Sequence, residues 1–227
     1  MVGTDDNVSY WNLGDIRLRA AEKGDADMFL RHFRSSPARV ERAFDAIGPP
    51  AVRQTAESWL SGYGVGVDGG NDGGGNGCDS GVGGGCDSGV GDGCNRLPDE
   101  SGDRRVFIIE DSQNGEFLGY IDVWEADARN GVFKTGIKML EGKAGKGHAT
   151  RAFIRVMEYY FNELRYQKCD VYIYEFNDAS HRFHKKLGFV EEGRLRREYY
   201  TDGRFYDSIC YGLTAEEFRE RALTYGK

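Results

Sequence analysis

The apolar positions between residues 149 and 164 repeat with the spacing of an amphipathic helix. They follow one another in alternating steps of one and three residues, which places them on one helical face. These positions are Ala152, Phe153, Val156, Met157, Tyr160, Phe161 and Leu164. Short apolar or alternating runs elsewhere in the chain predict β-strands. The predicted strands cover residues 16–19, 105–110, 117–125, 132–140, 169–174, 194–200 and 204–213.

Shorter helices are predicted over residues 25–33, 55–60 and 179–187. We expect Asp178 to cap the third of these helices, because its carboxylate can accept a hydrogen bond from a free first-turn amide. Gly188 is expected to end the same helix, since glycine adopts the left-handed conformation without steric cost.

Turn signals connect the predicted strands. Asn-Gly pairs at residues 114–115 and 130–131 predict β-hairpins. Thr214 and Glu217, three residues apart, predict a capping box at the start of a last helix. Antiparallel strands first, and then strands joined by helices, predict an α+β fold. We expect a central, mostly antiparallel twisted sheet flanked by helices.

A glycine-rich turn that contains Gly145 and Gly147 leads directly into the long amphipathic helix. The first amides of a helix lack internal partners and its dipole is positive there, so the turn suits a phosphate or diphosphate. Two common nucleotide motifs do not match. The phosphate-binding loop needs Lys and then Ser or Thr where His148 and Ala149 stand, and the dinucleotide fingerprint needs glycine at Thr150. An ordinary surface turn is the alternative interpretation.

A second motif supports the ligand-binding interpretation. It runs Asn177-Asp-Ala-Ser-His-Arg-Phe-His-Lys-Lys-Leu-Gly-Phe189 and follows a predicted strand. In this order, the turn and the motif resemble the GNAT superfamily of acyl-CoA-dependent N-acetyltransferases. The resemblance extends over residues 16–218, apart from one insertion. It is greatest to the branch that contains the ribosomal-protein N-terminal acetyltransferases and the spermidine-type acetyltransferases.

The resemblance implies a GNAT-like fold and a function. The protein would transfer an acetyl group from acetyl-CoA to a primary amine, which could be a protein N-terminus, a polyamine or a small amine. A catalytically inactive acyl-CoA-binding regulatory module is the first alternative. A scaffold whose glycine- and aspartate-rich loop binds calcium or a partner is the second.

The resemblance also implies which residues hold coenzyme A. Backbone amides of Met139 and Leu140 would bind the thioester carbonyl and the pantetheine arm, an oxyanion-type contact. Asn177 would bind the pantetheine, with Ser180 nearby, and Lys143 or a neighbouring lysine would add charge at the diphosphate. The residues expected to bind the diphosphate are Lys146, Gly147, His148, Ala149 and Thr150.

Two departures from the family pattern concern the chemistry. Ala144 stands where the family usually has Gln or Arg, which removes one phosphate contact. His184 stands where the family commonly has a Tyr that protonates the leaving thiolate, and an imidazole can also act as a general acid. A histidine on the helix surface is the alternative. Candidate general bases are Asp122 and Glu125, with Glu175 also near the expected cleft, and the sequence does not choose among them.

The acceptor pocket is expected between the first two helices and the hairpin over residues 194–206. Tyr199, Tyr200 and Tyr206 lie in this hairpin and could line the pocket or stand as exposed aromatic residues.

Composition separates one segment from the rest. Residues 62–95 contain 16 of the 33 glycines and five aspartates, without Lys or Arg. We expect residues 62–103 to be a disordered insertion, because this composition buries too little apolar surface to offset the entropy of ordering. The remaining expectations are a flexible N-terminus over residues 1–15 and one acetyltransferase domain over residues 16–227. Cysteines 78, 86 and 94 lack a zinc-like spacing, so no metal site is expected.

The whole-chain properties narrow the class of protein. A net charge of −7 without a basic run disfavours nucleic-acid binding. The sequence has no apolar run long enough to span a bilayer, and its first residues lack the features of a signal peptide. We therefore expect a cytoplasmic monomer or homodimer whose partners are acetyl-CoA and an amine.

Overall fold

The computed structural model describes residues 9–35, 53–65 and 104–225. Most of the predicted insertion, residues 66–103, lies outside these ranges, and so do residues 1–8 of the predicted flexible N-terminus. Residues 62–65, predicted to begin the disordered insertion, instead form a hydrogen-bonded turn in which the Tyr63 amide donates to the Leu60 carbonyl at 2.9 Å.

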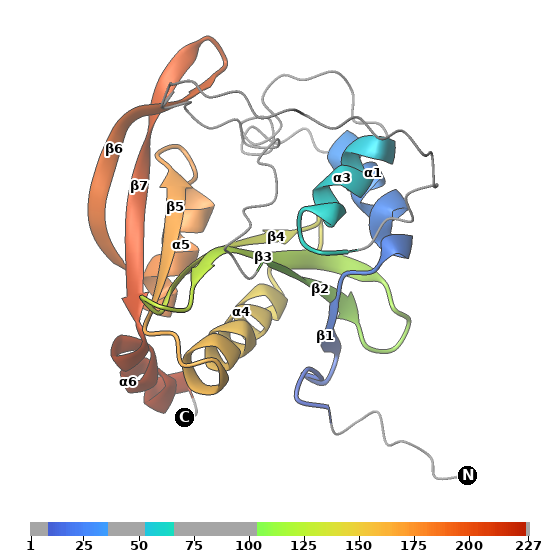
Figure 1. Ribbon diagram of the computed structural model, residues 1–227, viewed down its shortest axis with the longest axis horizontal. Helices are drawn as coiled ribbons and strands as arrows, with labels where there is room; N and C mark the ends of the chain where they lie inside the picture. The colour runs from blue at the N-terminus through green and yellow to red at the C-terminus, as the bar shows by residue number, and fades with distance from the viewer. Residues whose placement is uncertain (1–8, 36–52, 66–103, 226–227) are drawn as a thin grey trace, which may run out of the picture.

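The core of the described chain is a seven-stranded sheet in the order β1-β2-β3-β4-β5-β7-β6 (Figure 1). Every neighbouring pair is antiparallel except β4 and β5, which are parallel. The prediction of a mostly antiparallel sheet is therefore confirmed. The strands are β1 Ile16–Ala20, β2 Arg105–Asp111, β3 Phe117–Asp127, β4 Val132–Met139, β5 Lys168–Tyr174, β6 Val190–Thr201 and β7 Arg204–Thr214.

Helices cover both faces of this sheet. In Figure 1, α1 and α3 lie on one side of β2 and β3, and α4 lies on the other side. Two buried apolar clusters correspond to these layers: Phe29 and Tyr120 lie in the α1–α3 cluster, and Phe133 and Phe153 lie in the α4 cluster. The helices are η2 Lys23–Asp25, α1 Ala26–Ser35, α3 Arg53–Ser61, α4 His148–Glu158, η3 Tyr159–Glu163, α5 Asp178–Leu187 and α6 Ala215–Tyr225.

Several local predictions are confirmed by backbone geometry. The two predicted hairpins are present, since β2 pairs with β3 and β3 pairs with β4, and Gly115 and Gly131 in their turns have positive φ angles of 69° and 66°. The capping box is present, since the Thr214 amide donates to Glu217 Oε2 at 2.9 Å and the Glu217 amide donates to Thr214 Oγ1 at 3.3 Å. Gly188 ends α5 with a φ angle of 101°.

Three local expectations need correction. The cap of α5 is Asn177 rather than Asp178, because Asn177 Oδ1 accepts the Ser180 amide at 3.1 Å. The predicted long helix is α-helical only to Glu158, and its last turn, η3, is a π-helix. Residues 9–15 are not a flexible tail, since Trp11 packs against the main core and lies 5.4 Å from the ring of Phe107.

The parallel strands β4 and β5 diverge soon after they meet. Their register pairs Val132 with Lys168 at the start and Lys134 with Asp170 at the end. Beyond these three pairs, β4 continues to Met139 beside β3, and β5 continues to the end of its own pairing with β7. The two strands thus form a V-shaped opening in the sheet, hereafter the splay.

Candidate functional site

The turn before α4 presents free amides at a helix N-terminus. Gly145 and Gly147 have φ angles of 96° and 79°, and a Cβ on either would meet no atom within 4 Å. The first hydrogen bond of the helix runs from the Arg151 amide to the Gly147 carbonyl at 3.1 Å, and no side chain caps the helix. The amides of residues 148–150 therefore lack helical acceptors and can bind an anion.

The His148 side chain turns away from this role and braces the helix against β1. Its ring is buried, and Nε2 lies 3.2 Å from Asp15 Oδ2. Arg151 bonds to the same carboxylate at 2.6 Å and to the Leu13 carbonyl at 3.0 Å. The hydrogen bond from Arg151 has the largest effect, and together with the contact from His148 it lowers the pKa of the Asp15 carboxyl. The structure therefore leaves only the backbone amide of His148 available to a ligand at the turn.

The two lysines of the turn differ. Lys143 Nζ pairs with Glu116 at 2.7 Å, which partly neutralises its charge. Lys146 is exposed and forms no ion pair among the residues that the structure describes. Of the two candidates, Lys146 is therefore the cation available to compensate for the lost contact at Ala144.

The edge of β4 that faces the splay offers backbone groups. Leu140 does not contribute its amide, as the sequence suggested, because that amide donates to the Leu118 carbonyl at 2.9 Å. Backbone groups alternate in direction along an antiparallel strand. The amides of Met139 and Ile137 therefore point toward the splay. Of the predicted pair, Met139 can still contact a ligand there, and Ile137 takes the place of Leu140.

The start of α5 is fixed by its own polar residues. Asn177 Oδ1 serves as the helix cap, and the Ser180 hydroxyl lies 3.2 Å from His184 Nδ1. The side-chain oxygen of Asn177 thus has a hydrogen-bond partner within the helix, without any ligand. The interpretation of Asn177 as a cap residue is therefore confirmed, and its contact with pantetheine remains a prediction.

His184 is a core residue rather than a surface histidine. Only 4% of its surface is exposed, and Nδ1 lies 2.9 Å from the Ser180 carbonyl. Burial lowers the pKa of His184 to about 4, so the ring is neutral at neutral pH. Nδ1 carries the proton that the carbonyl accepts, which leaves Nε2 unprotonated and without a partner among the described residues. The ring packs edge-on against Phe153, Phe183 and Phe189.

This environment does not support His184 as a general acid. A neutral ring whose single proton is bound to a carbonyl has none to give to a thiolate. The sequence did not indicate this, because burial among three aromatic rings depends on how α5 packs against α4.

Asp122 is the candidate base that the structure places beside the splay. It follows Tyr120 by two residues on β3, so both side chains lie on the α1–α3 face. The Tyr63 hydroxyl donates to Asp122 Oδ2 at 3.1 Å. Burial raises the pKa of Asp122, and the bond from Tyr63 partly opposes that shift. The sequence did not single out Tyr63, which lies 59 residues away in the chain.

The other two carboxylates are already paired. Glu125 forms an ion pair with Lys134, and Glu175 lies 3.2 Å from Arg194. Arg194 also binds Asp207 at 2.8 Å. Because both carboxylates are engaged in ion pairs, Asp122 is the candidate that remains available to an incoming amine.

The three hairpin tyrosines do not form one surface. Tyr206 is buried and accepts a hydrogen bond from Arg204, and Tyr199 packs edge-on against Tyr174 with ring centroids 4.2 Å apart. Tyr200 is 61% exposed. An open cavity of about 590 Å³ lies beside the bulge of β6 and is lined by Arg196, Arg197 and Asp207.

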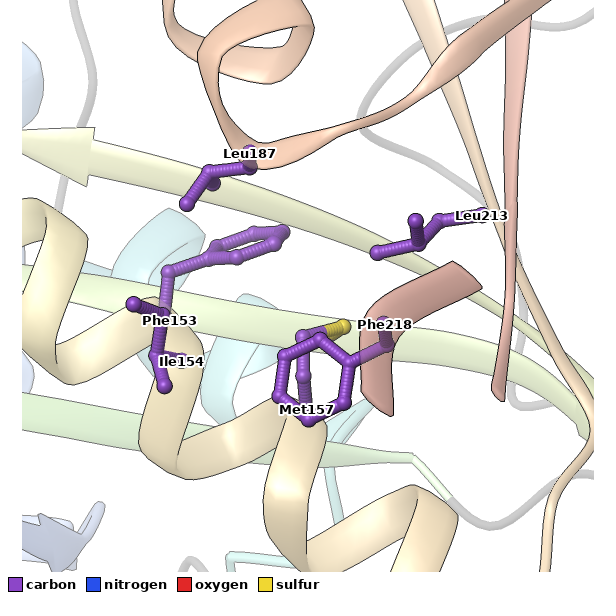
Figure 2. Close-up of a pocket in the computed structure, with 6 residues that line it drawn as sticks. All are labelled: Phe153, Ile154, Met157, Leu187, Leu213 and Phe218. Atoms are coloured by element: carbon purple, nitrogen blue, oxygen red, sulfur yellow. The ribbon is translucent and has the colours of Figure 1, made fainter. Parts of the chain in front are cut away.

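A second, apolar space lies between α4, α5, α6 and β7. Figure 2 shows its side chains converging from these elements, and the space has no volume for a water molecule. It is therefore a seam of the core. The residues that line it are Phe153, Ile154, Met157, Leu187, Leu213 and Phe218.

The described residues contain no group of three or more His, Cys, Asp or Glu side chains that could hold a metal ion. Within the same part of the chain, no helix has both the length and the apolar character needed to cross a membrane.

Comparison with known proteins identifies the family. The profile of the acetyltransferase (GNAT) domain matches residues 15–190. The SPbeta prophage-derived uncharacterized N-acetyltransferase YokL of Bacillus subtilis is 42% identical over 112 residues, which cover 49% of this chain and 63% of YokL. Spermidine N(1)-acetyltransferase of Vibrio cholerae is 27% identical over 113 residues, or 50% of this chain and 64% of that enzyme. The chain thus spans slightly less than two thirds of the length of these curated relatives.

A solved structure supports the same fold. Spermidine N-acetyltransferase from Vibrio cholerae, in complex with CoA and spermine, matches with a TM-score of 0.65 and 19% identity. The match covers 90% of this chain and 98% of that one. The family profile, the sheet with its splay and the glycine turn before α4 agree, and the chain belongs to the GNAT acetyltransferase family.

Proposed function

We propose that this protein is an N-acetyltransferase that transfers an acetyl group from acetyl-CoA to a primary amine. The observation that carries the proposal is the uncapped N-terminus of α4, which the glycine turn connects to the strand that borders the splay. Curated relatives are N-acetyltransferases, and one solved relative binds CoA and spermine. The acceptor is a protein N-terminus, a polyamine or a small amine.

The residues at the turn fit the diphosphate of coenzyme A. The amides of residues 148–150 would bind it, Gly145 and Gly147 would let it approach closely, and Lys146 would add charge. The pantetheine arm would lie in the splay, where the amides of Met139 and Ile137 could bind its polar groups and the thioester carbonyl. Acetyl-CoA supplies the activated acetyl group.

The acceptor must reach the thioester as a neutral amine. In our proposal, Asp122 takes a proton from the nitrogen while the nitrogen lone pair forms a bond to the carbonyl carbon. The carbon–sulfur bond then breaks, and the thiolate takes a proton from solvent because His184 has none to give. Holding the amine and the thioester in line would supply much of the rate.

An inactive CoA-binding module is the second candidate. It is favoured by the neutral, buried His184 and by Ala144, which both depart from the family pattern. This alternative predicts tight CoA binding without turnover for any amine.

A substitution at the turn tests both candidates. In Gly147→Glu, the new carboxylate would repel the diphosphate, and the positive φ angle at this position would strain the backbone. We expect the CoA dissociation constant, measured by calorimetry, to rise by about tenfold or more. Gly203→Glu is the matched control, since Gly203 has a φ angle of 78° and equally open surroundings in the β6–β7 turn. Thiol release from acetyl-CoA would be followed with spermidine and N-terminal peptides. Absence of CoA binding in the wild type would overturn both candidates, and binding without release would favour the second.

A further inference from the structure

Asp122 faces the splay across a residue that has no side chain. Its register partner on β4 is Gly136, which lies beyond the last β4–β5 pair. A Cβ on Gly136 would come within 2.9 Å of Asp122 Oδ1 and within 3.4 Å of the Trp124 ring. A side chain at Gly136 would displace the Asp122 carboxylate, which occupies the space over β4 that such a side chain would otherwise fill.

The Tyr63 ring is held firmly beside this carboxylate. Its amide donates to the Leu60 carbonyl at 2.9 Å in the turn that ends α3. The ring centroid lies 4.8 Å from that of Trp59, and the Arg104 guanidinium stacks 5.5 Å from the same ring. The hydroxyl donates to Asp122 Oδ2, so Oδ1 faces Gly136 and the splay.

We infer that Tyr63 is a positioning residue that orients the Asp122 carboxylate, through Oδ2, toward an amine that enters the splay over Gly136. This inference rests on the proposed function. In the step it serves, the amine proton moves to Asp122 Oδ1, the carbon–nitrogen bond forms and the carbon–sulfur bond breaks, with the thiolate protonated by solvent. Tyr63 itself exchanges no proton.

The groups around Asp122 determine the direction in which its pKa should move when Tyr63 is changed. Burial raises the pKa of Asp122, whereas the Tyr63 hydrogen bond, Lys138 on β4 and Arg104 before β2 lower it. Burial also raises the pKa of the Tyr63 hydroxyl well above its ordinary value, so it remains a donor at neutral pH. Because the hydroxyl bonds to the charged carboxylate, its removal makes Asp122 harder to ionise.

The test is Tyr63→Phe. Carbon-detected NMR titration of the aspartate carboxyls, with Asp122→Asn to identify the resonance, should show the Asp122 pKa rising by about one unit. The acid limb of kcat/KM, measured with acetyl-CoA and with spermidine or an N-terminal peptide, should move up in pH by the same amount. The plateau at higher pH, where Asp122 is ionised in both proteins, should fall severalfold, because a carboxylate that Tyr63 no longer orients is less well placed to take the amine proton.

A matched variant controls for the loss of a tyrosine hydroxyl. Tyr159→Phe removes a 3.1 Å hydrogen bond with Arg105 on the opposite face of the sheet, and it should leave the limb in place. An Asp122 pKa that does not rise, or an acid limb that does not move even though the rate falls, would overturn the inference alone. Absence of both CoA binding and turnover would overturn the proposed function and this inference with it.

Discussion

At the scale of single residues, His184 shows how packing can replace one chemical role with another. The family's common tyrosine has a hydroxyl to donate, whereas the imidazole here is neutral and enclosed by three phenylalanine rings. Its pKa lies below the unfolded value, so the unfolded chain binds the extra proton first as the pH falls. His184 therefore links acidity to stability rather than to proton transfer.

This linkage predicts a pH-dependent loss of stability. The contribution of His184 is fully present above its unfolded pKa of about 6.5. It is lost as the pH falls toward the folded pKa of about 4. The difference between these two pKa values corresponds to about 3 kcal/mol in the free energy of unfolding. In His184→Leu, urea unfolding between these pH values should show a correspondingly weaker decline. An unchanged decline would contradict the assignment of a neutral buried ring.

At the scale of elements, the periodicity of the sequence predicts the strands and helices. It does not predict every helix cap or every strand pairing. The α4 pattern and both Asn-Gly hairpins are visible in the sequence because these signals are local. Whether Asn177 or Asp178 caps α5 depends on backbone angles that the two neighbours do not reveal. The splay is visible only in the pairing of β4 with β5, which ends at Lys134 and Asp170, and the residue pattern of neither strand indicates that end.

The cap of α5 provides a prediction that separates structure from ligand binding. Asn177→Ala removes the acceptor of the Ser180 amide and should lower the free energy of unfolding by about 1 kcal/mol. Asn177→Asp keeps a capping oxygen and should restore most of that stability in urea unfolding.

The same pair of variants also tests the predicted pantetheine contact. If the Asn177 side-chain amide binds CoA, Asn177→Asp should bind CoA more weakly than the wild type in calorimetry, although its free energy of unfolding is restored. Recovery of both properties together would restrict Asn177 to its capping role.

At the scale of the molecule, the two ends of the glycine-rich segment meet over the candidate base. Tyr63 lies just before residues 66–103 and Arg104 just after them, and the two side chains stack. Their meeting at Asp122 was not visible in the sequence, because it joins positions from three separate elements. Local patterns thus predicted the fold and located the glycine turn before α4, whereas the environment of the candidate base became visible only in the folded chain.

This arrangement predicts the outcome of a deletion. Replacing residues 66–103 by a Gly-Ser linker of about four residues should preserve CoA affinity and the acid limb of the rate, because Tyr63 and Arg104 remain. Calorimetry and the pH profile would check this. Loss of CoA binding in a folded deletion variant would instead support a scaffold role for the segment.

The position of β6 at the end of the strand order has a consequence for solubility. A border strand of twelve residues offers a row of backbone groups on which a foreign strand could build. Two irregularities interrupt that row, between Glu191 and Gly193 and between Leu195 and Tyr199, and charged side chains flank both. These irregularities and charges oppose edge-to-edge pairing of β6 with a strand from another copy of the protein.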